Sequence, residues 1–369
     1  FSLIFDNKKY ILFTFLVFGF INLSFLTQRQ LLMAILKDKY HRTINYLRIS
    51  ITDRCNLRCQ YCMPEEGVPL IPHEEILRYE EILRLVKVYA QAGISKIRLT
   101  GGEPLVRKGV VNFISQLAKT PGINDLSMTT NGVLLKEFAQ PLKNAGLKRI
   151  NISLDTLKPD KFYNITRRNK FHEVWAGIEK ALEVGLSPVK LNVVVINGTN
   201  HNEVIDFALL TKRLPLVVRF IEYMPAGGNQ WSSDLVFPAP KIKKIIEGLG
   251  ELIPVNEKEN MGPAIRYRFR KSPGEVGFIN PISSHFCASC NRIRLTPDGH
   301  LRPCLFSDEE IDLKTLLRTG CSDEKLLEIL HEALAKKPRQ HHITTNSCLL
   351  YTSDAADELD GVDLGGRRI

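Results

Sequence analysis

Short runs of β-branched and other apolar residues alternate along the chain with longer stretches whose apolar residues recur at helical spacing. The short runs predict buried strands, and the longer stretches predict amphipathic helices. We predict six strands, at Tyr46 to Ile51, Lys96 to Thr100, Leu126 to Thr130, Arg149 to Leu154, Val189 to Val195 and Val217 to Ile221. Six strand and helix repeats predict a parallel sheet, either doubly wound or curled into a partial barrel.

Polar residues follow the successive strands at the point where each one ends. They are the cysteines after residue 54, Gly101 to Pro104, Thr130 to Gly132, Ser153 and Asp155, and Glu222 to Pro225, with Lys190 and Asn192 on the fifth strand. Active sites of parallel barrels form at the carboxyl ends of their strands. For one loop, Gly and Asn are explained well enough by a turn. Polar residues in step on or after all six strands favour an α/β fold, a partial (β/α)6 TIM-type barrel with a smaller C-terminal domain.

The alternation stops after residue 225, where a Gly/Pro-rich connection begins. Later helices are predicted at Ala239 to Leu249, Leu313 to Arg318 and Asp323 to Ala335. We therefore assign residues 41–230 to the barrel and residues 231–342 to the smaller C-terminal domain.

The two ends of the chain do not fit this pattern. Ile11 to Leu26 is almost wholly apolar, yet it is short for a membrane span and no small-residue cleavage site follows it. We interpret residues 1–32 as translation upstream of Met33 and not as a membrane anchor. Residues 343–369 are acidic and Asp/Gly-rich without hydrophobic period, and we interpret them as a foreign, disordered tail.

The formal net charge is +10 over 369 residues. The first 32 residues contribute +2 and the last 27 contribute −3, so that residues 33–342 carry +11. This excess suits a polyanionic partner, whether nucleic acid, a membrane surface or a nucleoside triphosphate, and charge alone does not choose among them.

Six of the eight cysteines form two triplets, Cys55, Cys59 and Cys62, then Cys287, Cys290 and Cys304. Tight cysteine groups in a long chain indicate metal in a reducing compartment. Structural zinc sites and four-cysteine iron-sulfur sites have four ligands, whereas three thiolates on a 4Fe-4S cluster leave one iron open. The alternative is zinc completed by a distant residue, which for the second triplet could be His285, His300 or Cys321.

The first triplet, within Cys55-Asn56-Leu57-Arg58-Cys59-Gln60-Tyr61-Cys62, resembles the cluster motif of radical S-adenosylmethionine enzymes, and Gly101 to Pro104 resembles the motif that binds the methionine amine in that superfamily. The second triplet lies within Cys290 to Leu295 and Leu301 to Phe306. These two segments closely resemble the GTP 3',8-cyclase family, which starts molybdenum cofactor biosynthesis. The resemblance covers about residues 40–342.

This resemblance implies two 4Fe-4S clusters, S-adenosylmethionine as cofactor and GTP as substrate. Residues implied to bind GTP are Arg48, Arg98, Thr129, Lys190, Arg292, Ile293 and Arg294, of which Arg48, Arg292 and Arg294 are the candidate catalytic residues. Residues implied to bind S-adenosylmethionine are Tyr61, Gly102, Ser153 and Met224, with Glu103 near the methionine amine. The open iron of the second cluster is implied to meet the guanine base.

The implied reaction starts with a 5'-deoxyadenosyl radical that takes hydrogen from C3' of GTP. The C3' radical then adds to C8, and reduction gives (8S)-3',8-cyclo-7,8-dihydroguanosine 5'-triphosphate. An electron donor and the downstream cyclic pyranopterin monophosphate synthase are the implied partners, a homodimer is left open, and we expect a cytoplasmic enzyme without nucleic-acid or membrane partners.

One departure concerns the C-terminus, because the family ends in a Gly-Gly tail that reaches the active site. Here Gly365 and Gly366 are followed by Arg367 to Ile369 and preceded by acidic sequence unlike the family. We do not assign the tail's role to them, and we expect slow turnover.

Two alternatives remain open at this point. A radical enzyme of peptide maturation also carries an auxiliary cluster after its barrel, although Arg292 to Arg294 inside the second triplet favours the cyclase. A zinc-dependent nucleic-acid binding protein would explain the basic charge, but the chain has only 8% aromatic residues to stack on bases.

Overall fold

The computed structural model describes residues 35–225, 231–255, 263–284, 286–307 and 309–341. The interpretations of the apolar leader and of the acidic tail therefore lie outside the described residues. Within the described part of the chain, no helix combines the length and the apolar character needed to cross a membrane.

One sheet runs through the described chain in the order β12-β11-β10-β1-β2-β3-β4-β5-β6-β9-β8-β7. The first six strands are β1 (Tyr46–Ser50), β2 (Lys96–Thr100), β3 (Asp125–Thr130), β4 (Arg149–Ser153), β5 (Val189–Val195) and β6 (Leu216–Glu222). They pair in parallel with their neighbours throughout. The predicted strands are confirmed, each end to within one residue of its predicted position.

The C-terminal residues extend this sheet at both edges. Strand β9 (Glu275–Ile279) pairs in parallel with β6, and β10 (Arg292–Leu295) pairs in parallel with β1. Antiparallel strands complete the edges, namely β7 (Leu252–Pro254), β8 (Ile265–Phe269), β11 (His300–Arg302) and β12 (Ile311–Asp312). The described strands of residues 231–342, which we assigned to a C-terminal domain, thus continue the barrel sheet.

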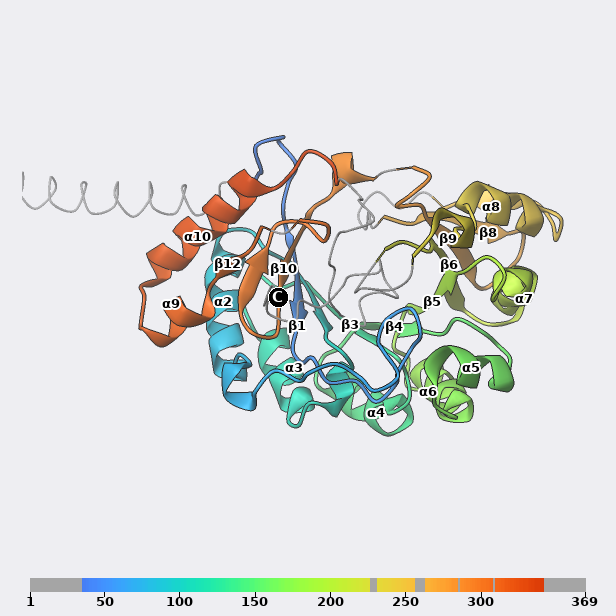
Figure 1. Cartoon of the computed structure of the whole chain (residues 1–369), viewed down its shortest axis with the longest axis horizontal. Helices are drawn as coiled ribbons and strands as arrows, with labels where there is room; N and C mark the ends of the chain where they lie inside the picture. The colour runs from blue at the N-terminus through green and yellow to red at the C-terminus, as the bar shows by residue number, and fades with distance from the viewer. Residues whose placement is uncertain (1–34, 226–230, 256–262, 285, 308, 342–369) are drawn as a thin grey trace, which may run out of the picture.

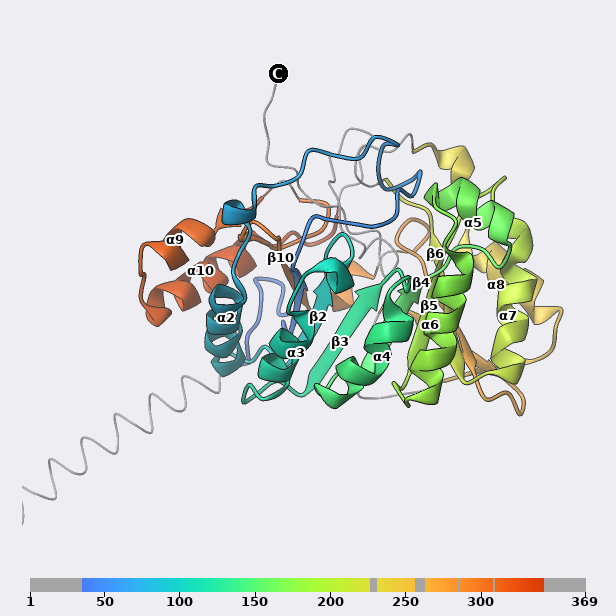
Figure 2. The same cartoon turned by 90° about the horizontal axis from the view of Figure 1, so that it is seen from below.

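Helices cover the outer side of the curved sheet (Figures 1 and 2). They are α2 (Tyr79–Gln91), α3 (Val110–Ala118), α4 (Leu135–Asn144), α5 (Pro159–Thr166), α6 (Phe171–Glu183), α7 (Val204–Arg213), α8 (Ala239–Glu247), α9 (Lys314–Arg318) and α10 (Asp323–Lys336). Short 3-10 turns lie at His73–Glu75, Pro104–Val106, His201–Glu203, Ser233–Leu235 and Cys287–Ser289. Helix α10 packs beside α2, so the end of the described chain returns to its beginning.

The strands separate their side chains onto two faces because successive residues of a strand point in opposite directions. On β1, Leu47 and Ile49 are fully buried in the main hydrophobic core, whereas Tyr46, Arg48 and Ser50 alternate with them. The apolar face packs against the helices. The other face, directed into the partial barrel, carries polar and charged residues and positions the site.

Candidate active site

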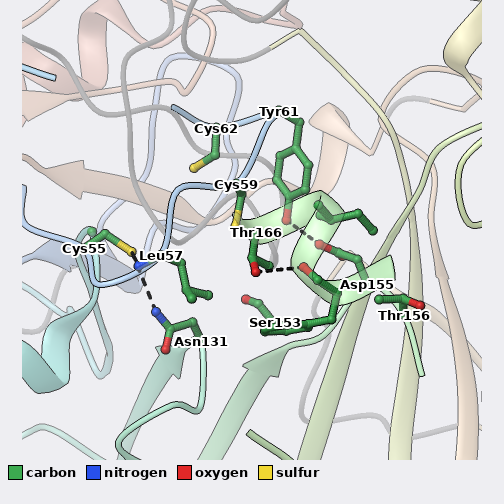
Figure 3. Close-up of a pocket in the computed structure, with 13 residues that line it drawn as sticks. Cys55, Leu57, Cys59, Tyr61, Cys62, Asn131, Ser153, Asp155, Thr156 and Thr166 are labelled. Carbon is green, nitrogen blue, oxygen red and sulfur yellow. Dashed lines mark hydrogen bonds between the residues drawn. The ribbon is translucent and has the colours of Figure 1, made fainter. Parts of the chain in front are cut away.

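The first cysteine triplet lies on the loop that follows β1, at the carboxyl end of the parallel strands. Backbone N–H groups of Cys62 and Met63 both donate to the carbonyl of Cys59 at 2.9 Å, which closes a tight turn around the motif. The Cys55 sulfur accepts from Leu57 N at 3.4 Å and from Asn131 Nδ2 at 3.7 Å. Figure 3 shows the three sulfur atoms gathered at one cavity, with Ser153 and Asp155 across from them.

This cavity encloses about 580 Å³ of empty volume, part of it open to solvent. Its wall includes all three cysteines together with Tyr61, Gly102 and Ser153. The structure therefore brings together, from three different loops, the thiols and three of the residues assigned to S-adenosylmethionine.

Burial makes the cysteine thiols poor acids in the absence of a cation. It raises the pKa of Cys55 to about 11 and the pKa of Cys59 well above its ordinary value, to which the neighbouring thiols add. Buried thiolates need positive charge beside them. The irons of a 4Fe-4S cluster supply that charge, and so the chemistry of these donors fits such a cluster.

The packing of two loops requires a residue without a side chain at Gly102. A Cβ at this position would stand 2.3 Å from the Arg54 carbonyl oxygen and 2.7 Å from that of Asp53. The N–H of Gly102 donates to Thr52 O and the N–H of Glu103 donates to Arg54 O, both at 2.7 Å. Residues 101–103 thus pack against and hydrogen-bond to residues 52–54, which lead into the cysteine loop.

Glu103 ties three segments together from behind the cavity wall. Its fully buried carboxylate accepts from the N–H of Leu105 at 3.0 Å, from the Thr130 hydroxyl at 2.7 Å and from the N–H of Asn131 at 2.7 Å. Burial raises its pKa to about 7, against the effect of these hydrogen bonds. Glu103 does not contribute to the described cavity wall, so its contacts point to loop anchoring more than to the expected contact with the methionine amine.

A hydrogen bond from Tyr61 to Asp155 fixes the tyrosine side chain. Asp155 was not among the residues implied to bind S-adenosylmethionine. The Tyr61 hydroxyl donates to Asp155 Oδ2 at 2.5 Å (Figure 3). The N–H of Val194 donates to Asp155 Oδ1 at 2.9 Å. Burial raises the pKa of Asp155 to about 6. Met224 is 1% exposed and packs in the same apolar cluster as Tyr61, outside the cavity wall.

The inner face of the sheet carries a belt of cations. Arg48 lies opposite Arg294 on β10 and opposite Arg98 on β2. Residues at paired positions point to the same face, so these three arginines are neighbours. Thr129, Asn151 and Lys190 form a second such row across β3, β4 and β5. The residues assigned to GTP on five strands therefore meet on one surface.

Two further arginines belong to this belt. Burial lowers the pKa of Lys190 well below its ordinary value, and the neighbouring cations Arg219, Arg149 and Arg98 lower it further. Arg219 donates to Asn192 Oδ1 at 2.8 Å and is 5% exposed. Sequence reasoning missed Arg149 and Arg219, although their period-two spacing from inward residues on the same strands could have indicated them.

The second cysteine triplet gathers at the amino end of β10. Cys287 and Cys290 precede β10, and Cys304 follows β11, which runs antiparallel to it. Because β10 is parallel to β1, this end of the strand is opposite the end where the first triplet lies. The cationic face lies between the two. Leu305, next to Cys304, packs in the apolar cluster that contains Tyr61 and thereby links the two sites.

Cations surround the Cys290 sulfur. Burial works to raise its pKa, but Lys337, Arg292 and Arg294 outweigh that effect and lower the pKa well below the ordinary value. Arg292 also donates to this sulfur at 3.6 Å. A thiol that ionises readily fits a cluster ligand.

Three other predicted positions are placed as follows. The Ile293 side chain is fully buried in the main hydrophobic core, so the implied contact with GTP would fall to its backbone. His300 pairs with Asp298 at 3.1 Å, and Cys321 packs against the main core. His341, which sequence reasoning missed, brings Nδ1 within 3.0 Å of the Cys287 sulfur.

Comparisons with known proteins agree with this arrangement. Residues 49–211 match the Radical SAM superfamily model, and residues 216–343 match the model for Molybdenum Cofactor Synthesis C. A GTP 3',8-cyclase of Thermodesulfovibrio yellowstonii is 53% identical over 306 residues, which cover 82% of this chain and 95% of the relative. Another, of Moorella thermoacetica, is 54% identical over 308 residues, covering 84% and 95% respectively.

Solved structures show the same fold at low identity. Streptococcus suis SuiB has a TM-score of 0.56 at 15% identity, covering 90% of this chain and 75% of its own. The same protein bound to S-adenosylmethionine gives 0.55 at 14% identity, covering 78% and 67%. These matches confirm the predicted partial barrel.

Proposed function

The chain belongs to the GTP 3',8-cyclase family of the radical S-adenosylmethionine superfamily and acts in molybdenum cofactor biosynthesis, and we propose from this premise how its residues share the reaction. The observation that carries the proposal is the cationic inner face placed between two cysteine triplets. Each triplet provides three thiolates, which suits one 4Fe-4S cluster with an open iron.

The inner face is the proposed binding site for the GTP triphosphate. Arg48, Arg98 and Arg294 are adjacent across three strands, and Lys190 stands in the next row with Thr129. Charge-assisted hydrogen bonds to phosphate are strong, and arginine can form two in parallel. Self-repulsion among these buried cations is relieved when a polyanion binds, which favours GTP over a neutral ligand.

The cavity beside the first triplet is the proposed S-adenosylmethionine site. Tyr61, locked by Asp155, and Ser153 line it, while Gly102 keeps the cysteine loop close. When bound there, the first cluster and S-adenosylmethionine supply the 5'-deoxyadenosyl radical that removes hydrogen from C3' of GTP. The chain's own part is to hold the triphosphate so that C3' faces this cavity and to exclude water.

The second triplet is the proposed site of the guanine base. Cys287, Cys290 and Cys304 would hold a cluster there, and Arg292 reaches its rim. Fixing the base and the triphosphate at two points brings C8 within reach of the C3' radical. Addition to C8, followed by one electron and one proton, gives (8S)-3',8-cyclo-7,8-dihydroguanosine 5'-triphosphate. The electron requires a donor protein, and the product passes to a cyclic pyranopterin monophosphate synthase.

The test is an anaerobic assay of residues 33–369 reconstituted with iron and sulfide. Dithionite, S-adenosylmethionine and GTP are added, and 5'-deoxyadenosine and cyclised nucleotide are measured. We expect about eight irons per chain and a product that depends on GTP. Deoxyadenosine without any nucleotide product would contradict the assigned substrate, unless grafting a family-type Gly-Gly tail restores it.

The same assay separates the alternative functions. A peptide-maturation enzyme would form deoxyadenosine with a peptide substrate, whereas we expect stimulation by GTP and not by ATP or peptide. The likeness to SuiB supports a shared fold alone. A zinc-dependent nucleic-acid binding protein would load zinc and hold no acid-labile sulfide.

A further inference from the structure

Lys337 directly follows the last residue of α10 and lies next to the two segments that carry Cys290 and Cys304. Its ammonium donates to the carbonyl oxygen of Arg292 at 2.8 Å and to that of Pro303 at 2.6 Å. Arg292 follows Cys290 by two residues, and Pro303 directly precedes Cys304. One side chain therefore connects the two segments that present these cysteines.

The ammonium is fully enclosed, and the part of the chain that the structure describes places no carboxylate within ion-pair distance of it. Lys337 is 2% exposed, and among the described residues no carboxylate forms an ion pair with it. Arg294 and Arg42 act on it as neighbouring cations, and the groups whose negative charge would act on it are the thiols of Cys290 and Cys304 once ionised. A buried charge is strongly unfavourable unless an opposite charge pairs with it.

The residues after Lys337 continue along the same triplet. Arg42 donates to the carbonyl oxygen of Cys287 at 2.8 Å, and also to those of Pro338 at 2.7 Å and Arg339 at 3.1 Å. His341 then reaches the Cys287 sulfur at 3.0 Å. Residues 337–341 thus run past all three cysteines and contact the chain beside each of them.

A cluster would provide the missing negative charge. A 4Fe-4S core in its +2 state carries a net charge of −1 once three thiolates bind it, and −2 after one-electron reduction. A fixed cation stabilises the reduced form more than the oxidised form, because attraction grows with the charge on the cluster. The placement of Lys337 therefore bears on both the retention and the potential of the cluster.

We propose that Lys337 is a positioning residue for the second cluster: it fastens the segments of Cys290 and Cys304 to each other and supplies the buried positive charge that balances the cluster. This inference rests on the proposed function, since it presupposes that the second triplet holds a cluster.

The experiment compares Lys337→Met with Lys336→Met in the full chain. Lys336 is the neighbouring residue, 40% exposed and paired with Glu332 at 2.8 Å on the surface of α10, so it controls for loss of one lysine. Each substitution is made in two proteins. One keeps the first triplet, and in the other Cys55, Cys59 and Cys62 are changed to alanine, so that all bound iron belongs to the second triplet.

We measure iron per chain and follow reduction of the cluster by electron paramagnetic resonance at fixed potentials. With the first triplet removed, we expect Lys336→Met to keep about four irons. In Lys337→Met we expect either loss of that iron, or a ratio of reduced to oxidised cluster about tenfold lower, which corresponds to about 59 mV for one electron. Iron content and potential equal to those of Lys336→Met would overturn the proposal.

Two measurements keep the result interpretable. With the first triplet intact, Lys337→Met should retain at least about four irons, those of the first cluster, which shows that the barrel has folded. If it loses them, Lys337→Gln replaces it, because its amide can still donate to one carbonyl. An unchanged potential in Lys337→Gln would equally refute the charge role. If the chain with Lys337 intact binds no iron at the second triplet, the proposed second cluster itself is wrong, and that outcome is distinct from failure of the lysine's role.

Discussion

Replacing Gly102 by alanine tests whether the loop after β2 supports the first cluster. The added Cβ would stand 2.3 Å from the Arg54 carbonyl oxygen, about 1 Å inside van der Waals contact. The atoms that the new Cβ would meet belong to the backbone of Asp53 and Arg54, so no side chain can rotate away to relieve the clash. The cysteine loop has to shift by a similar distance.

That shift breaks two hydrogen bonds of 2.7 Å, from Gly102 N to Thr52 O and from Glu103 N to Arg54 O. Each contributes about 1 kcal/mol net, and with the steric overlap we expect the free energy of unfolding to fall by about 2–4 kcal/mol. The displaced thiols no longer meet at one cluster. We therefore expect Gly102→Ala to bind about four irons per chain in place of about eight, and to lose cleavage of S-adenosylmethionine.

The assay measures iron, sulfide and 5'-deoxyadenosine on anaerobically reconstituted protein, with thermal unfolding in parallel. Gly248→Ala is the control, because its Cβ would meet only Ile245 O at 3.2 Å, at a helix end remote in sequence from both triplets. A Gly102→Ala protein with wild-type iron and wild-type deoxyadenosine formation would refute the reasoning.

Three further predictions follow from the same site. Lys190→Met should raise the KM for GTP about 10- to 100-fold through loss of one charge-assisted contact, while the iron content stays the same. The control Lys180→Met removes a surface lysine paired with Glu183 and should leave the KM unchanged. Equal effects of the two substitutions on KM would contradict the assignment of Lys190 to GTP. Because burial raises the pKa of Glu103 to about 7, the folded state holds this proton more tightly than the unfolded chain, and cluster-free protein should lose about 3 kcal/mol of unfolding free energy as pH rises from about 4 to 7. Glu103→Gln should flatten that profile in urea unfolding experiments, and an unchanged slope would show that another group titrates. Cys304→Ala should keep about four irons and residual cleavage of S-adenosylmethionine yet form no cyclised nucleotide, whereas product formation would exclude the second cluster from the reaction.

Local patterns in the sequence predicted the strands and the first triplet well. Strands β2 and β5 are short runs rich in β-branched and other apolar residues, and the sequence located both to the residue. The three cysteines of the first triplet lie within eight residues, and one turn suffices to bring them together. Their chemistry could therefore be inferred before any fold was known.

Contacts between distant parts of the chain could not be predicted in this way. Arg42 and Cys287 are 245 positions apart, and Lys337 contacts carbonyls 45 and 34 positions earlier. No periodicity connects such residues, because the pairing of β10 with β1 brings Cys287 to Arg42, and the return of α10 beside α2 brings in Lys337. The sequence motif also could not distinguish Arg292 from Ile293, which are adjacent in it. The pleat of β10 points the Ile293 side chain into the core and the Arg292 side chain toward the site.

The sequence by itself thus determined the repeat of strands and helices, the two cysteine triplets and the family, because these depend on residues close along the chain. The tertiary structure decided which cations share the inner face, why Gly102 must lack a side chain and what surrounds the second triplet. These features depend on strand register and on burial, and burial is what turns an ordinary arginine or lysine into a group that requires an anion beside it.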